Sequence, residues 1–136
     1  MATVERSSSY GLRVQLECGY AEAVGKVTEA LKTQGFGVLT EINVKDTFKK
    51  KLDREFTPFV ILGACNPNLA WKAFAADLDV GLLLPCNVTV YTHPQSGKTM
   101  VGVIDPLAMM AVTGKPELEA VAQEARTKLE AALAAL

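Results

Sequence analysis

The sequence predicts an α+β fold with one mainly antiparallel sheet, ordered strand, helix, four strands, helix. Short helical insertions interrupt this order, and the two longer helices lie on one face. Residues 12–18 alternate strictly between apolar and polar side chains, which is typical of a strand with one face in water and favours antiparallel pairing. Residues 116–136 carry an apolar stripe at helical spacing behind Pro116. Short apolar runs between them, bounded by Gly, Pro and Asn, predict the remaining strands.

The length and charge of the chain bound its class. With 136 residues it can bury a core without disulfides or metal, so we take 1–136 as a single domain with residues 1–9 as a loosely ordered tail. A net charge of -1 offers no basic field to phosphate backbones, so we expect no nucleic acid partner. No apolar run reaches the ~18 residues of a membrane span, and no signal peptide is evident. We therefore expect a soluble cytoplasmic protein with no membrane partner and free cysteine thiols.

The elements of the first half follow from local patterns. Residues 21–35 place apolar side chains at helical spacing, and Gly35 is expected to end this helix because glycine adopts the left-handed conformation at little cost. Residues 36–44 alternate and predict a second strand, in which Glu41 is expected to face solvent. Residues 46–53 predict a short helical insertion.

An apolar run leads directly into a helix start at residues 59–67. Residues 59–64 are continuously apolar, which predicts a strand covered on both faces. Asn66 is a good N-cap, and Pro67 suits the first helical position. Cys65 then lies beside a helix N-terminus, which favours a thiolate; the same helix start suits an anionic ligand. A cysteine buried for packing alone is an equally good interpretation.

A second Cys-Asn pair lies in the predicted strand at residues 80–91. Pro85 cannot donate a hydrogen bond to a neighbouring strand and marks a bulge or an edge. Plain alternation buries Cys86, whereas a bulge would turn it to the other face. Asn87 has donors that would satisfy the acceptor left unpaired by the proline.

The relative direction of the two strands decides whether the thiols meet. If residues 59–64 and 80–91 run parallel, Cys65 lies level with Cys86. If they run antiparallel, Cys86 pairs near residue 60, and the thiols lie about 16 Å apart at ~3.3 Å per residue. The antiparallel case excludes a disulfide between them.

The last strand, at residues 99–105, ends at Asp105, and an Ala/Met-rich connector leads to the final helix. A metal set of Cys65, Cys86, Asp105 and the single histidine, His93, has no supporting spacing, so we expect no metal site there. A thiol nucleophile would have no evident base other than Glu41 or Asp105.

Several motifs together resemble the domain-of-unknown-function family 302. They are GFGVLTEINV, KKKL, ILGACNP, GLLLPCNVTVY and VIDP, and the resemblance runs from about residue 10 to 135. It implies a TATA-binding-protein-like α+β fold, antiparallel strand pairing and a homodimer, with no established activity. The positions that match the family motifs are Glu41, Lys51, Cys65, Asn66, Pro67, Pro85, Cys86, Asn87, Asp105 and Pro106.

Three functions fit the sequence, and none names a cofactor. The first is a homodimer that binds a small ligand or metal in a cleft near Cys65 and Cys86. Its further candidate binding residues are Asn66, Asn87, Glu41, Lys51 and Asp105. The second is a structural or interaction module with buried cysteines. The third is a thiol-based redox protein that uses Cys65, which requires a lowered pKa for that thiol.

Overall fold

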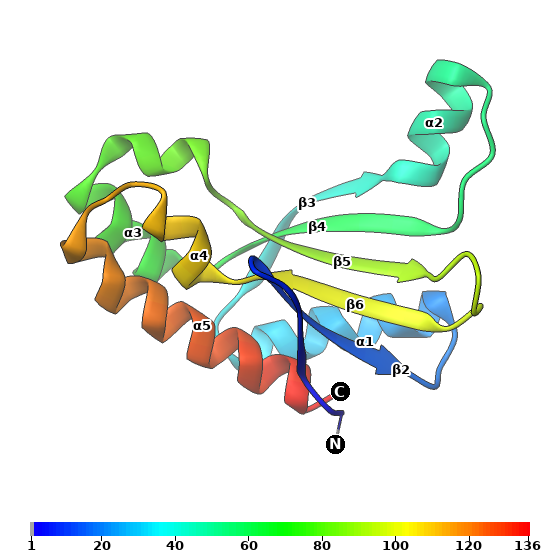
Figure 1. Cartoon of the computed structure of the whole chain (residues 1–136), viewed down its shortest axis with the longest axis horizontal. Helices are drawn as coiled ribbons and strands as arrows, with labels where there is room; N and C mark the ends of the chain where they lie inside the picture. Colours follow the sequence, from blue (N-terminus) through cyan, green and yellow to red (C-terminus); the bar gives the residue numbers. More distant parts are fainter. Residues whose placement is uncertain (1) are drawn as a thin grey trace.

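The computed structural model describes residues 2–136, which form a six-stranded antiparallel sheet and five α-helices (Figure 1). The predicted α+β fold class is confirmed. The strands, in the spatial order β1-β2-β6-β5-β4-β3, are β1 (Glu5–Ser8), β2 (Gly11–Leu16), β6 (Thr99–Ile104), β5 (Cys86–Thr92), β4 (Phe59–Cys65) and β3 (Gly37–Asn43). The α-helices are α1 (Tyr20–Thr33), α2 (Val44–Leu52), α3 (Pro67–Ala76), α4 (Pro106–Ala111) and α5 (Glu119–Ala134). Two short 3-10 helices are η1 (Leu78–Leu82) and η2 (Pro116–Leu118). Within the described range, no helix is both long and apolar enough to cross a bilayer.

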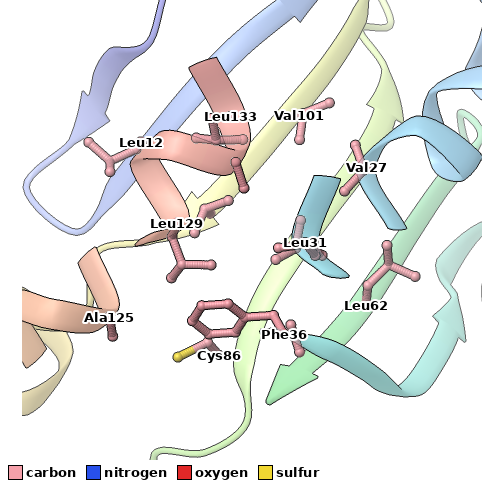
Figure 2. Packing of buried hydrophobic residues seen from close by; sticks show 14 of the residues in the cluster. Leu12, Val27, Leu31, Phe36, Leu62, Cys86, Val101, Ala125, Leu129 and Leu133 are labelled. Carbon is pink, nitrogen blue, oxygen red and sulfur yellow. The ribbon is translucent and has the colours of Figure 1, made fainter. Parts of the chain in front are cut away.

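The two longer helices, α1 and α5, cover one face of the sheet, as expected (Figure 1). Side chains that the pairing register aligns on this face are buried, for example Leu62 beside Val88 and Val14 beside Val101. Figure 2 shows Leu129 and Leu133 of α5 and Leu31 of α1 in the same cluster. Each large aliphatic side chain removed from water in this way contributes roughly 1.5–3 kcal/mol.

Within residues 2–136, the two longer helices cover only one face of the sheet, and this corrects the prediction that β4 is covered on both faces. Val60, Leu62 and Ala64 are buried, but Phe59 and Ile61 on the other face are half-buried. The side chains of β4 on this second face are apolar as well, and they take part in aromatic contacts. The Phe59 ring stacks on Tyr91 with centroids 4.8 Å apart.

The structure also differs from the sequence-based prediction at the N-terminus and at the start of β5. Residues 5–8, expected in a loose tail, form β1, which pairs with β2 and is tied to it by an ion pair between Glu5 and Arg13. The strand expected at residues 80–91 begins only at Cys86. The preceding apolar run forms η1 instead, because the Asp77 side chain accepts a hydrogen bond from the Asp79 N–H and starts a 3-10 turn.

The end of α1 follows the predicted glycine stop. Gly35 has φ +80° and donates its N–H to Lys32 O at 3.0 Å, and Phe36 donates to Leu31 O at 2.9 Å. This is the Schellman pattern, in which the amide of the left-handed residue and the amide that follows it satisfy the last carbonyls of the helix. The turn places β3 beside β4 and sends Phe36 into the core.

Replacing Gly35 with alanine is expected to lower the free energy of unfolding by about 1–2 kcal/mol, because a side chain disfavours the left-handed region. A Cβ there would also lie only 3.0 Å from Asn66 Nδ2. The matched control is Gly25→Ala, inside α1, where a Cβ meets nothing within 4 Å and alanine is the better helix former. Urea denaturation should show opposite signs for the two variants; equal signs would contradict the interpretation.

Candidate functional site

Strand pairing brings the two Cys-Asn motifs together. β4 and β5 are antiparallel, as the family resemblance implied, but Cys86 pairs with Ala64, the residue next to Cys65. The predicted pairing near residue 60, with thiols about 16 Å apart, is therefore wrong. It assumed a strand that begins at residue 80, whereas β5 begins at Cys86, so the register moves toward the end of β4.

A cavity of about 260 Å³ lies at this end of the sheet, where α3, α4 and α5 approach it. Cys65 and Cys86 both line it. Figure 2 shows Cys86 with Phe36 and Ala125, which also belong to the lining. The remaining lining residues are Leu39, Ala64, Asn66, Leu69, Ala70, Ala73, Phe74, Gly81, Leu84, Pro85, Pro106, Met109, Met110, Val121 and Ala122. None of these residues carries a charged side chain.

Both thiols are held in their neutral form. Burial raises the pKa of Cys86 to about 11, and the neighbouring Cys65 contributes to the increase. Burial also raises the pKa of Cys65. The redox hypothesis requires the opposite direction, a lowered pKa for Cys65.

Asn66 is the N-cap of α3, as predicted. Its Oδ1 accepts a hydrogen bond from the Leu69 N–H at 3.3 Å, and its Nδ2 donates to Gln34 O at 3.3 Å. Because both ends of the amide are engaged, Asn66 orients the start of α3 against the end of α1. It acts as a positioning residue at the cavity wall.

Asn87 and Glu41 lie outside the cavity lining. Asn87 pairs with Gly63 and is exposed, in a shallow groove on the open face with Tyr10 and Thr89. Within residues 2–136 its side chain makes no hydrogen bond, so the predicted repair of the strand pairing is not observed. Glu41 is exposed, as predicted; it pairs with Leu62, three residues or roughly 10 Å of strand from Cys65.

Lys51 and Asp105 are also separate from the two thiols. Lys51 is exposed on α2, which lies at the opposite end of the molecule from α3 and α4 (Figure 1). Asp105 is only 1% exposed, and its Oδ1 caps α4 by accepting the Leu107 N–H at 3.0 Å. Its Oδ2 lies 3.1 Å from the Arg6 guanidinium and 3.7 Å from that of Arg126.

The four-residue metal set considered from the sequence is not assembled. Asp105 is engaged by two arginines, and His93 lies in the β5–β6 turn, where its Nδ1 accepts the Gln95 N–H at 3.2 Å. Cys86 lies at the other end of β5. Across residues 2–136, no group of three or more His, Cys, Asp or Glu residues is placed to hold a metal ion.

The sequence-based prediction missed α4, one of the three α-helices that line the cavity. Residues after Asp105 were taken as a connector, yet they form α4 and supply Pro106, Met109 and Met110 to the lining. A signal was available, because Asp105-Pro106 repeats the cap-then-proline pattern that correctly identified the start of α3.

Comparison with known proteins supports the motif resemblance. The model of a family described as "Domain of unknown function DUF302" matches residues 12–136. A crystal structure described as an uncharacterized conserved DUF302 protein from Bacillus stearothermophilus is similar in sequence, at 32% identity, and in fold, with a TM-score of 0.86. The match covers 93% of this chain and 98% of that one. The search of curated proteins gave no match. The chain therefore belongs to the DUF302 family.

Proposed function

We propose that this protein binds a small, uncharged, largely apolar molecule in the cavity beside Cys65 and Cys86. The observation that carries the proposal is a cavity of about 260 Å³ whose lining contains no charged side chain. An engineered apolar cavity of ~150 Å³ takes up benzene, and natural small-molecule sites begin near ~300 Å³. The cavity therefore suits a ligand larger than one aromatic ring but smaller than most cofactors.

The polar groups at the cavity wall favour a neutral ligand. A charged ligand placed there would lose its hydration without gaining a partner of opposite charge. The thiols of Cys65 and Cys86 offer weak hydrogen bonds, and the Asn66 amide is already engaged with backbone groups. Affinity would come from apolar area removed from water, at about 25 cal/mol per Å².

The sequence also suggested two other functions, a thiol-based redox role and a structural or interaction module. A redox role for Cys65 is disfavoured because burial raises the pKa of that thiol. A structural or interaction module, in which Cys65 and Cys86 serve only packing, predicts that the cavity takes up no ligand. The two proposals are therefore separated by a binding measurement.

Titration with N-phenylnaphthylamine, an uncharged apolar fluorophore, is expected to show saturable binding. Ala70, half-buried in α3, lines the cavity, so Ala70→Phe should fill it and weaken binding at least ~10-fold. Ala75→Phe, exposed on the same helix and outside the lining, should bind as the wild type does. Anilinonaphthalenesulfonate, a related fluorophore that carries a negative charge, should bind at least ~10-fold more weakly.

Thermal unfolding of both variants controls for folding, and Ala70→Leu offers a milder filling if the phenylalanine is not accommodated. Absence of saturable binding to the wild type would refute the proposal. So would undiminished binding to a folded Ala70 variant.

We also propose that the protein is located in the cytoplasm and forms a homodimer. Free cysteines among the described residues, Cys18, Cys65 and Cys86, fit a reducing compartment. Strand β3 is an edge strand with exposed Leu39 and Ile42, and an unpaired edge is a template for pairing with another chain.

A further inference from the structure

Sulfur-bearing side chains gather at the cavity. Two of the chain's three cysteines, Cys65 and Cys86, line it, and so do two of its four methionines, Met109 and Met110. Cys86 is a free thiol that is only 6% exposed, and both methionines are buried as well. The cavity wall therefore presents four soft donors, two thiols and two thioethers, which come from β4, β5 and α4.

Strand pairing places the two thiols close together. Cys86 pairs with Ala64, so the Cα atoms of Cys86 and Cys65 lie roughly 6 Å apart across the two strands. Cys65 is the last residue of β4, and the cavity extends around this strand end to reach both side chains. Figure 2 shows the Cys86 sulfur pointing to the side on which Ala125 of α5 lies. Besides burial, the neighbouring Cys65 raises the pKa of Cys86, which is a second indication that the sulfurs are near each other.

The two methionines reach the same end of the sheet because α4 begins level with Cys86. Val88 of β5 pairs with Val103 of β6, and this register, continued by two residues, sets Cys86 opposite Asp105. Asp105 is the N-cap of α4. Met109 donates its N–H to Asp105 O at 3.0 Å, so it lies one helical turn beyond that level. The first turns of α4 thus bring both thioethers to the strand ends that carry the thiols.

The type of donor determines which metal this wall suits. Thiolate and thioether ligands favour Cu(I), whereas carboxylate and carbonyl oxygens favour hard cations such as Mg²⁺ and Ca²⁺. Among the lining residues given above, none carries a carboxylate or an imidazole, and the Asn66 Oδ1 already accepts the Leu69 N–H. The set differs from the one considered from the sequence, since two thioethers take the place of Asp105 and His93.

The charge balance of the cavity favours a monovalent ion. A Cu⁺ ion that binds the Cys86 sulfur displaces the thiol proton to water, and the resulting thiolate–Cu(I) unit is neutral. The two thioethers and the Cys65 thiol are uncharged donors, so the occupied cavity stays uncharged. The ion thereby gains a partner of opposite charge, which a charged organic ligand would lack there.

We propose that the cavity binds one Cu(I) ion through the sulfur atoms of Cys86, Cys65, Met109 and Met110. The apolar side chains around these sulfurs limit the access of water to the ion. The proposal is independent of the apolar ligand, because it depends on the sulfur donors and not on the volume of the cavity.

Competition with bicinchoninate, a chelator that is coloured when it holds Cu(I), tests the proposal under anaerobic conditions. The wild type should withdraw one equivalent of Cu(I), and it should bind Zn(II) at least ~100-fold more weakly. Cys86→Ser should lower the Cu(I) affinity at least ~100-fold because it removes the thiolate. Met109→Leu/Met110→Leu should lower it at least ~10-fold, since leucine keeps the apolar volume but has no sulfur.

Cys18→Ser and Met100→Leu are the matched controls. Cys18 and Met100 lie outside the cavity lining, and each carries the same sulfur group as a proposed ligand. Met100 is buried, so its replacement also reports the effect of changing a buried methionine. Both variants should hold Cu(I) as tightly as the wild type does, and thermal unfolding checks that all variants are folded.

Unchanged Cu(I) affinity in folded Cys86→Ser or in the folded double-methionine variant would overturn the proposal. So would loss of binding in Cys18→Ser, or an equal affinity for Zn(II). The double-methionine variant should still bind N-phenylnaphthylamine, because leucine is also apolar. A wild type that binds Cu(I) but not the fluorophore would refute only the proposed function, and the reverse result would refute only the metal site.

Discussion

Replacing Asp105 with alanine is expected to lower the free energy of unfolding by about 3 kcal/mol. The carboxylate is 1% exposed, caps α4 through Leu107, and is paired with Arg6 and Arg126. Loss of a helix cap costs ~1 kcal/mol, and removal of the buried carboxylate leaves the partly exposed guanidinium groups of Arg6 and Arg126 without this partner. Urea denaturation at neutral pH measures the loss.

Two variants separate the contributions at this site. Asp105→Asn keeps an oxygen that can accept the Leu107 N–H and removes only the charge, so it should cost less than alanine by about 1 kcal/mol. Glu5→Ala breaks the ion pair with Arg13, which is shorter at 2.8 Å but exposed, and should change stability by no more than about 0.5–1 kcal/mol. If Asp105→Ala costs no more than Glu5→Ala, burial does not set the strength of these pairs.

Raising the pH from about 8.5 to 11 is expected to destabilise the protein through Cys86. An unfolded cysteine ionises near pH 8.5, whereas burial keeps the folded thiol protonated up to a pKa of about 11. In this window the folded state binds more protons than the unfolded state, so stability falls as pH rises. Below the pKa that Cys86 has in the unfolded state, the thiol is neutral in both states, and its contribution to folding stability is fully present. About 3 kcal/mol is lost by the upper end of the window.

The comparison with Cys86→Ala isolates this effect from other groups that titrate at high pH. One such group is Tyr20, whose pKa is raised by burial and then by Glu41 and Asp46. The variant starts from a lower stability because it removes a buried sulfur, but its stability should fall less steeply over the same pH range. Parallel curves for wild type and variant would contradict the buried, neutral state of Cys86.

Most elements of the fold were predictable because their determinants are local. Gly35 ends α1 and Asn66 begins α3 through residues within a few positions of each, and the sequence displays both patterns directly. The prediction failed at residues 78–85, where the apolar run is compatible with either a strand or a helical turn. The Asp77 side chain decides for η1, and β5 starts later as a result.

The candidate site was only partly predictable for the same reason. The sequence singled out Cys65, Cys86 and Asn66, which all line the cavity, but it also selected Lys51 and Asn87, which do not. Some motif residues line the cavity together with the thiols, whereas others, such as Asp105, stabilise the fold elsewhere. Spacing along the chain does not distinguish these roles.

By itself, the sequence determined the α+β class, the alternation of most strands, the end of α1 and the start of α3, since these depend on contiguous residues. Only the tertiary structure decided that Cys86 pairs with Ala64 and that α3, α4 and α5 enclose a cavity at that position. Register depends on where both strands begin, and a cavity depends on how helices distant in the sequence pack. Both are properties of contacts between segments, which no single segment encodes.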